Sequence, residues 1–554
     1  MKLLLINPMF PDSLWCFRGI RHITPAHAHA PLGLCTVAGL TPPDVDVEIL
    51  DENVESIDFD RPCDIVAMTA FNVQVQRALE IAEEFRKRGK TVIFGGPYAS
   101  LIGEKFLPYF DVVFKGETEY TWPQFINDYK NGSYKNLYKQ EGNIDISKSP
   151  TPRYDLLKAE RYACFYLQTT RGCPFKCEFC DIIISDGRIP RAKSVEQIMR
   201  EAEVLRKIGA NTVTFSDANF IGNPNSAKKI LESLVEWGKQ HNFPIRWNCE
   251  LTINVAERDD LLELARQANF GGMFFGIETP RKSSLTETLK TVNLKRSLVD
   301  SIRKVQSYNI VTWSGMIVGF DHDDNQIFQE QLDFLQEAGI PFTTAGILVA
   351  IPLTPLYERL EKEGRLQMDL SRMIEDSEKW RGHGSGDLNF IPKLMTPEEI
   401  KTGYNWLIRA MYSYDAFSDR LIRCFSNFKK YPALRKKDPN EKFSLPHFLK
   451  GIKLLAQIFK HFLLTKNKKR RQFFMKVMKA YWQNREVWGF ENIISCLTLH
   501  IHFHFYVSES QGNPDTAGFT SPFDGIEPLT LHTAGSEPAL IASKGSGPFL
   551  AQGV

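Results

Sequence analysis

The sequence lacks the segments that mark an exported or membrane-inserted protein. No run of about 18 apolar residues occurs in the chain, so no membrane-spanning helix is predicted. The first residues, "MKLLLINPMF", have one Lys and a short apolar run but no small-residue cleavage site, which fits a buried strand better than a signal peptide. We therefore expect a cytoplasmic protein.

The chain also lacks a disulfide framework and an excess of charge of either sign. Its formal net charge is +2, so the overall balance indicates no particular partner. A length of 554 residues, with 43% apolar and 24% charged residues, predicts a globular protein of two or three domains. Outside one cluster the cysteines are scattered, which fits a reducing compartment; they are Cys16, Cys35, Cys63, Cys164, Cys249, Cys424 and Cys496.

Residues 1–130 alternate short apolar runs with amphipathic helices. The runs "KLLLIN", "DIVAMTA" and "TVIFGGP" predict buried strands, and "VQVQRALEIAEEFRKRG" predicts a helix between two of them. This alternation predicts a parallel sheet covered on both faces, whose ligands would bind where the strands end. Those ends carry Asn7, Thr69, Gly95, Gly96, Pro97, Gly116 and Glu117.

A second α/β region follows a polar connector at residues 131–165. From 166 to 365 six strand signals alternate with helical patterns such as "SVEQIMREAEVLRKIG". Six successive units predict a full or partial (β/α)6 barrel, in which functional residues lie at the strand ends.

The C-terminal part changes character. We expect a mostly helical region at 366–506, with a basic stretch at 421–480 that holds 17 Lys and Arg against Asp438 and Glu441. Interleaved Phe, Leu and Ile favour an anionic membrane surface over nucleic acid as its partner. The alternative is an ordinary helical domain with a solvated basic face. Residues 507–554 are rich in Gly, Ser and Pro, which predicts disorder.

Three cysteines follow the first predicted barrel strand, in "RGCPFKCEFCD". Cys173, Cys177 and Cys180 are spaced C-x3-C-x2-C, and thiolates this close can hold only a compact soft-metal centre. A structural zinc site and an ordinary electron-transfer [4Fe–4S] cluster each need a fourth ligand, which would have to come from elsewhere. Three thiolates on a [4Fe–4S] cluster would leave one iron open to a substrate or cofactor.

This spacing, with Phe179 before the last cysteine, resembles the signature of the radical S-adenosylmethionine (AdoMet) family. The resemblance implies that the three cysteines hold a [4Fe–4S] cluster whose open iron binds AdoMet and cleaves it to a 5'-deoxyadenosyl radical. The stretches "TFSDANF", "FFGIET" and "SGMIVGF" resemble weaker motifs of the family. Taken singly, a strand-end acid can cap a helix and a strand Gly can mark a bulge. The implied AdoMet contacts are Phe179, Asp217, Asn219, Glu278, Gly315 and Gly319.

The first domain resembles the flavodoxin- or Rossmann-like cobalamin-binding domain that precedes many such barrels. The resemblance rests on "LLINP", "PLGL", "GGPYAS" and "KGETEYTWPQF". The cobalamin contacts that it implies are Asn7, Thr69, Gly95, Gly96, Pro97, Gly116 and Glu117. The D-x-H-x-x-G motif, which supplies a lower axial His in many corrinoid proteins, is absent. We therefore expect either a corrinoid without a protein His ligand or a module that no longer holds one.

Residues 1 to about 420 are similar to a subgroup that includes the hopanoid C-2 methylases, on "GRIPRAK", "GMIVGFDHDD" and "IPLTPLYERLEKEGRL". This similarity implies cobalamin-dependent methylation of an unactivated carbon, on a hopanoid or other isoprenoid lipid. We also expect an electron donor such as flavodoxin or ferredoxin. From the basic stretch we expect peripheral contact with the inner membrane and no nucleic acid. The alternatives are a radical SAM cyclase or oxidoreductase without methyl transfer and a non-catalytic Fe–S or corrinoid-binding sensor.

Overall fold

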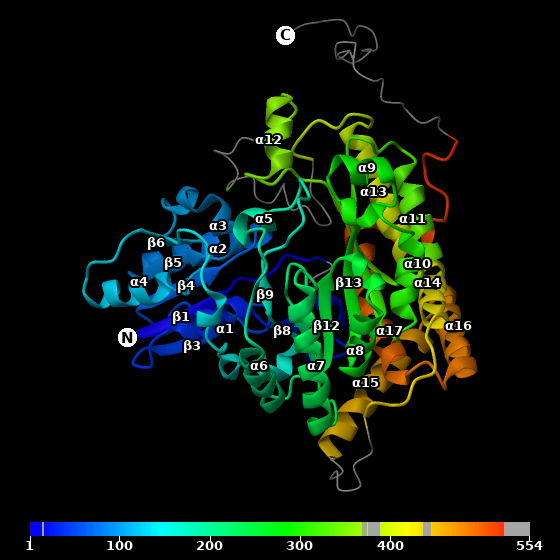
Figure 1. Ribbon diagram of the computed structural model, residues 1–554, viewed down its shortest axis with the longest axis horizontal. Helices are drawn as coiled ribbons and strands as arrows, with labels where there is room; N and C mark the ends of the chain where they lie inside the picture. Colours follow the sequence, from blue (N-terminus) through cyan, green and yellow to red (C-terminus); the bar gives the residue numbers. More distant parts are fainter. Residues whose placement is uncertain (14–15, 368–373, 375–387, 436–444, 526–554) are drawn as a thin grey trace, which may run out of the picture.

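Two parallel sheets dominate the structure, a computed structural model that describes every residue except 14–15, 368–373, 375–387, 436–444 and 526–554 (Figure 1). The first sheet comes from the N-terminal domain, and the second curls into a half-barrel beside it. Helices of the C-terminal region pack on the far side of the half-barrel. The predicted α/β fold with a curled parallel sheet is thus confirmed.

The first sheet is buried on both faces, because its strands are nearly continuous runs of Leu, Ile, Val and Phe. Helices α1 (Leu32–Leu40) and α4 (Thr121–Lys130) cover one face, and α2 (Val75–Lys87) and α3 (Pro97–Ile102) cover the other. The strand order is β3-β1-β4-β5-β6-β7. The bounds are β1 Lys2–Asn7, β3 Asp46–Asp51, β4 Ile65–Thr69, β5 Thr91–Gly95, β6 Val112–Lys115 and β7 Leu137–Lys139.

This order is doubly wound. Strand β1 lies between β3 and β4, so the direction of the winding changes between β1 and β4. Ligands of such sheets bind outside the strand ends at this point, where Asn7 and Thr69 lie. The segment 131–165, expected to be a connector, supplies the edge strand β7 and the beginning of β8 (Tyr162–Leu167).

The second sheet has the order β15-β14-β13-β12-β11-β8-β2, with every neighbouring pair parallel. Six strands follow one another in chain order, as predicted for a partial barrel, and β2 (Ala28–His29) of the N-terminal region joins the edge. Helices α6 (Val195–Lys207), α7 (Pro224–His241), α8 (Asp259–Gln267), α10 (Leu298–Gln306) and α11 (Ile327–Ala338) lie outside the sheet (Figure 1). The other strands are β11 Thr212–Phe215, β12 Arg246–Leu251, β13 Phe270–Glu278, β14 Val311–Val318 and β15 Phe342–Ile347.

Local signals explain where several helices begin and end. Helix α6 starts at a capping box, in which Ser194 and Gln197 each satisfy the other's backbone N–H. Helix α11 ends at Gly339, which has φ +68° and suits a left-handed helix end.

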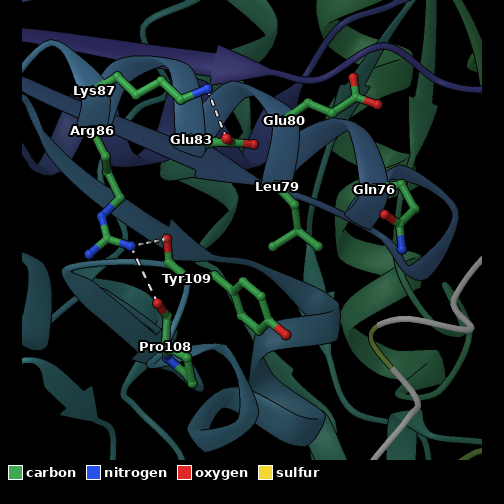
Figure 2. A pocket seen from close by; sticks show the side chains of 8 residues that line it. All are labelled: Gln76, Leu79, Glu80, Glu83, Arg86, Lys87, Pro108 and Tyr109. Atoms are coloured by element: carbon green, nitrogen blue, oxygen red, sulfur yellow. Dashed lines mark hydrogen bonds and ion pairs between the residues drawn. The ribbon is translucent and has the colours of Figure 1, made fainter.

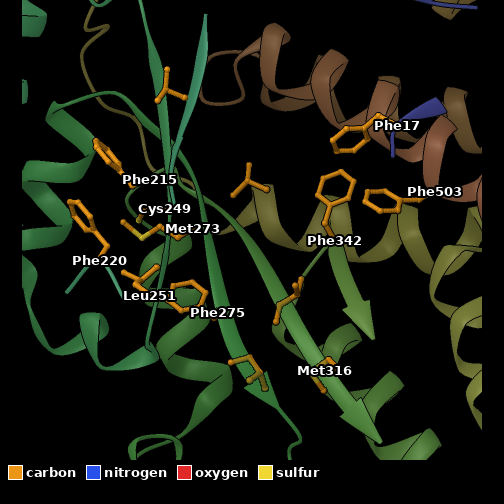
Figure 3. Close-up of a cluster of buried hydrophobic side chains, with 14 of the residues drawn as sticks. Phe17, Phe215, Phe220, Cys249, Leu251, Met273, Phe275, Met316, Phe342 and Phe503 are labelled. Carbon is orange, nitrogen blue, oxygen red and sulfur yellow. The ribbon is translucent and has the colours of Figure 1, made fainter. Parts of the chain in front are cut away.

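The outer face of the half-barrel is a conventional hydrophobic core. Phe215 stacks on Trp247 with ring centroids 5.3 Å apart, and Trp237 of α7 packs on Trp247 from outside. Figure 3 shows Phe215, Cys249, Met273 and their neighbours gathered on this side of the strands. Alternate strand residues therefore point to the helices, and the others point to the inner face.

The C-terminal region is helical, as predicted. Its helices are α13 (Pro397–Tyr412), α14 (Tyr414–Ser426), α15 (Leu445–Leu463), α16 (Lys468–Asn484) and α17 (Phe490–Gln511). None of the helices in the described part of the chain is long and apolar enough to cross a membrane.

The composition predicts disorder from residue 507 onward, but residues 507–525 are ordered in the structure. Helix α17 continues to Gln511, and a 3-10 turn follows at Pro514–Thr516. The backbone N–H of Tyr414 donates to the Asp515 carboxylate at 3.0 Å, and Trp406 donates to the Ala517 carbonyl at 3.1 Å. These tertiary contacts hold a segment whose composition alone predicts disorder. The rest of the predicted tail, 526–554, lies outside the described residues.

The described structure also has a surface cavity of about 460 Å³ between α2 and the turn at Pro108 and Tyr109 (Figure 2). Its charged groups are already engaged, since Lys87 pairs with Glu83 at 2.8 Å and Arg86 donates to the Pro108 carbonyl at 3.3 Å. None of the predicted site residues lines it.

Candidate functional site

The three predicted metal ligands lie on a loop that leaves the carboxyl end of β8. The loop is pinned at its base by the antiparallel pair β9 (Thr170–Arg171) and β10 (Arg191–Ala192), and it carries the short helix α5 (Ile182–Ser185). Gly172 has φ +99°, and a Cβ there would lie 2.9 Å from the Ile189 carbonyl oxygen, so this turn requires glycine.

The thiols themselves are sheltered from solvent. Cys177 is buried, and Cys173 and Cys180 are partly buried. Burial raises the pKa of the Cys177 thiol and raises that of Cys180 to about 12. In the described residues no three His, Cys, Asp or Glu side chains converge on one point as ligands of a single metal ion would.

A buried carboxylate fixes the start of the loop. Asp217, just after β11, accepts hydrogen bonds from the backbone N–H groups of Thr169 at 2.7 Å and Thr170 at 3.0 Å, and from the Thr169 hydroxyl. Its side chain is fully buried, and this burial raises its pKa. Asp217 therefore holds the chain that leads into the cysteine loop.

Asn219, the other predicted residue of "TFSDANF", contacts the chain just after the next strand. Its Oδ1 accepts from the backbone N–H of Thr252 at 3.2 Å, just after β12. Its Nδ2 is buried and has no hydrogen-bond partner among the described residues. An unsatisfied donor at this edge is available to a ligand.

A second anchor holds the middle of the loop. Glu178, between Cys177 and Cys180, pairs with Arg359 of α12 (Pro355–Lys362) at 2.7 Å, and its backbone N–H donates to the Thr288 carbonyl at 3.1 Å. Arg359 also pairs with Asp321 at 2.7 Å. The loop is thus tied to the segments that follow β13, β14 and β15.

A third anchor comes from the first domain. Arg171 pairs with Glu117 at 2.7 Å and with Glu119 at 2.8 Å, and Arg191 pairs with Glu117 at 2.9 Å. Burial lowers the pKa of Arg171, but the charges of Glu119 and Glu117 raise it by more. The guanidinium therefore stays charged. Glu117, predicted as a corrinoid contact, here joins the end of the first sheet to the cysteine loop.

An ion pair of Glu278 and Lys290 lies near the cysteines. Glu278 ends β13 with φ +64°, and its Oε1 lies 2.9 Å from the Nζ of Lys290. A Cβ at Gly276 would collide with this carboxylate and lie 2.9 Å from that Nζ. Burial lowers the pKa of Lys290, but the negative charges of Glu278 and Cys177 raise it more.

The other predicted AdoMet residues lie in the cysteine loop and along β14 (Val311–Val318) or just after it. Phe179 packs on Phe320 with ring centroids 6.0 Å apart. Gly319 has φ +106°, and its N–H donates to buried Asp323 at 3.0 Å. Gly315, in β14, faces Phe274: a Cβ there would lie 3.2 Å from that ring.

The residues predicted to contact cobalamin share one edge of the first sheet. Asn7 donates to Asp51 at 3.1 Å, and Gln74 donates to the Asn7 side chain at 3.3 Å. Gly96 has φ +96°, and a Cβ there would collide with the Thr69 hydroxyl. The rest of this edge is formed by Gly95 at the end of β5, by Pro97 at the start of α3 and by Gly116, which has φ +88°.

Sequence reasoning missed Arg171, Arg191 and Arg359, which hold the loop, and Lys290, which pairs with Glu278. Arg171 lies two residues before Cys173, which is the one signal that could have drawn attention to it. The partners of the others are 12 to 181 residues away along the chain, so no local pattern identifies them.

Comparison with known proteins agrees with this geometry. Residues 167–349 match the Radical SAM superfamily, and residues 354–514 match a domain of unknown function, DUF4070. An uncharacterised methyltransferase of Synechocystis sp. is 33% identical over 431 residues, which are 77% of this chain and 78% of that protein. The hopanoid C-2 methylase of Rhodopseudomonas palustris is 34% identical over 349 residues, which are 62% of this chain and 66% of that protein.

A solved structure shares the fold. The radical S-adenosylmethionine methyltransferase TsrM from Kitasatospora setae, solved with cobalamin and a [4Fe–4S] cluster bound, aligns with a TM-score of 0.60 at 15% identity, covering 87% of this chain and 99% of that one. Together with the matched region and the extent of the Synechocystis relative, the three-cysteine loop at the strand ends of a half-barrel shows that this chain belongs to the radical SAM superfamily.

Proposed function

We propose that this protein is a cobalamin-dependent radical SAM methyltransferase that methylates an unactivated carbon of an isoprenoid lipid. One observation carries the proposal: the cysteine loop is locked to the ligand-binding edge of a doubly wound sheet through Arg171, Glu117 and Glu119. The hopanoid C-2 methylase among the relatives supports the substrate class.

The residues present fit the cluster, AdoMet and the corrinoid. Three thiols from one loop suit a [4Fe–4S] cluster, and Cys173, Cys177 and Cys180 would hold it. The unpartnered Nδ2 of Asn219, together with Glu278, suits the polar end of AdoMet. At the first sheet the corrinoid would rest on the edge formed by Asn7, Thr69, Gly95, Gly96, Pro97 and Gly116.

When bound, the cluster and corrinoid supply reductive cleavage of AdoMet to a 5'-deoxyadenosyl radical and a transferable methyl group. The chain's own contribution is placement and shelter. Asp217, Glu178 and Arg171 fix the cysteine loop from three sides, and Lys290 puts a buried positive charge beside the thiolates. The one electron needed would come from a flavodoxin- or ferredoxin-type donor.

Anaerobically purified and reconstituted protein tests the proposal. We expect electron paramagnetic resonance and absorption spectra of a [4Fe–4S] cluster and a corrinoid, and formation of 5'-deoxyadenosine, S-adenosylhomocysteine and a methylated lipid. Replacing the three cysteines with Ala should abolish the cluster and AdoMet cleavage together. Deoxyadenosine without S-adenosylhomocysteine or methylated product would instead support a cyclase or oxidoreductase, and a cluster indifferent to AdoMet would support a sensor.

The basic stretch supplies a candidate membrane contact. Helix α15 exposes Leu449, Ile452, Phe459 and Leu463, and this spacing places them on one helical face. Exposed Lys453, Lys460, Lys466, Lys468 and Lys469 surround the face or follow it. Apolar side chains bordered by cations suit the surface of an anionic bilayer.

Vesicle co-sedimentation tests this contact. The protein should sediment with vesicles of phosphatidylglycerol and phosphatidylcholine but much less with phosphatidylcholine alone. Ile452→Ser with Phe459→Ser should weaken sedimentation, and Leu289→Ser, which changes an exposed apolar residue elsewhere, serves as the control. Equal sedimentation of the double variant and the control would refute the contact.

A further inference from the structure

The inner face of the half-barrel is accessible to solvent along β11, β12 and β13, whereas at β15 it is covered, since Phe342 is fully buried against Phe417 and Phe503. Thr214 pairs with Asn248 across β11 and β12, Glu250 pairs with Phe274 across β12 and β13, and Phe274 pairs with Trp313 across β13 and β14. In-register neighbours in a parallel sheet point to the same face. These side chains are partly or fully exposed, whereas the residues between them are buried.

Glu250 brings a carboxylate to this face. It is exposed, and none of the described residues makes a hydrogen bond or ion pair with its side chain. Its backbone carbonyl accepts from Phe220 at 2.9 Å, which fixes the strand at this point. Although solvent reaches the side chain, the surrounding barrel wall displaces much of the water around the carboxyl group, and this desolvation, with the charge of Asp217, raises its pKa to about 7.

The surroundings of Glu250 are largely aromatic. Phe274 lies beside it on β13, and Trp313 lies beyond on β14. A Cβ at Gly272 would lie 2.8 Å from the Asn248 Oδ1 and 3.6 Å from the Trp313 Nε1, so glycine lets these groups lie close to the sheet. Flat rings around one acceptor suit an apolar ligand with a single polar group.

The position of Glu250 relates this surface to the cysteine loop. It lies one residue before the carboxyl end of β12, and the cysteine loop leaves the same end of β8, two strands away. A ligand held at Glu250 and packed on Phe274 would therefore have one fixed part of its skeleton facing the cysteines.

We propose that Glu250 is the specificity-determining residue of this enzyme, accepting a hydrogen bond from the hydroxyl or ammonium group of an otherwise apolar, isoprenoid substrate. This inference rests on the proposed function. The unpaired carboxylate is satisfied only when the substrate carries a donor, so the site disfavours a hydrocarbon of the same shape.

Binding measurements test this without turnover. Three probes are used with holoenzyme in detergent micelles: a pentacyclic hopanoid alcohol, its amine analogue and the parent hydrocarbon. We expect the wild type to bind at least one donor-bearing probe at least about 10-fold more tightly than the hydrocarbon. Glu250→Leu, which keeps the bulk but removes the acceptor, should lose this preference.

The Gln variant separates the two donors. Because the Gln carbonyl still accepts a hydrogen bond but carries no charge, Glu250→Gln should retain much of the preference for an alcohol and lose that for an amine. Glu236→Gln, an exposed carboxylate of α7 paired with Lys239 at 2.7 Å, is the matched control and should bind like the wild type. Circular dichroism and cluster absorbance establish that each variant is folded.

Each outcome is decisive. A preference that survives in Glu250→Leu, or a wild type that binds no probe or binds all three equally, overturns the role of Glu250. A preference that depends on Glu250 without any methylated product supports this role and refutes the proposed methylation instead.

Discussion

The two parallel sheets of this molecule arise from the same alternation of strands and helices but use their faces differently. In the first sheet, β1, β4 and β5 are buried on both sides. In the second, β11 and β12 alternate buried residues with solvent-accessible ones. A sheet with two helical layers can offer a ligand only its edge, whereas a half-barrel also offers an inner surface.

This contrast separates structural residues from candidate functional ones. In the first sheet an apolar strand residue stabilises the domain whichever way it points. In β11 and β12 of the half-barrel only every second residue does so, and the others remain available to a substrate. Paired substitutions in the two sheets can therefore measure the difference.

The largest expected effect comes from matched Phe→Ala changes. Phe94 of β5 is fully buried and packs on Phe106 and Phe110 with ring centroids 4.5 and 4.6 Å apart. Phe94→Ala should lower the free energy of unfolding by about 3–5 kcal/mol through lost burial and cavity formation. Phe274→Ala, on the inner face and only partly buried, should lower it by clearly less. Urea unfolding followed by circular dichroism measures both, and equal losses would contradict the contrast.

Removing the ion pairs of Arg171 with Glu117 and Glu119, which connect the first domain to the cysteine loop, should have the next largest effect. Arg171→Gln leaves buried Glu119 without its ion-pair partner and Glu117 with Arg191 alone, which should cost about 3 kcal/mol. The control is Arg153→Gln, whose pair with Asp155 at 2.8 Å is exposed and should cost less than about 1 kcal/mol. Thermal unfolding and cluster content are the measurements. If the Arg171→Gln protein is as stable as the control, these ion pairs contribute little to the stability of the folded protein.

Much of the contrast could be predicted from the sequence. "KLLLIN" and "TVIFG" are continuous apolar runs, which indicated a sheet buried on both faces, and the cysteine spacing indicated the loop at a strand end. The resemblance of "TFSDANF" and "FFGIET" to motifs of the radical AdoMet family implies Asp217 and Glu278 as contacts. The structure adds that both hold neighbouring chain, Asp217 through Thr169 and Glu278 through Lys290.

The remaining features depend on contacts between distant segments. The pair of Arg171 and Glu117 joins two domains, and β2 enters the half-barrel from the N-terminal region. Neither has a periodic or local signal, because pairing is decided by how the sheets pack. The order in residues 507–525 likewise follows from contacts such as that of Asp515 with Tyr414, which composition does not encode.

Glycine substitutions should give a smaller difference between the sheets. Gly96 has a left-handed φ, and a Cβ would collide with the Thr69 hydroxyl, so Gly96→Ala should cost about 1–3 kcal/mol. Gly272 lies in a regular strand, and its Cβ would lie 2.8 Å from the flexible end of Asn248, so Gly272→Ala should cost less than about 1 kcal/mol. Urea unfolding again provides the comparison, and the reverse order would argue against an accommodating inner face.

The smallest expected effect is a dependence of stability on pH that arises from Glu250 on the inner face. Burial raises the pKa of Glu250 to about 7, whereas an unfolded Glu has a pKa of about 4.3. Between these values the folded protein retains a proton that the unfolded chain has released, so this group's contribution to stability falls as pH rises from about 4.3 to about 7 and is constant above. Because solvent reaches the side chain, the effect should be modest. Melting temperature measured against pH tests this. Between about pH 4.3 and 7 the curve of Glu250→Gln should be flatter than that of the control Glu236→Gln. Parallel curves for the two variants would show that Glu250 is solvated like a surface carboxylate.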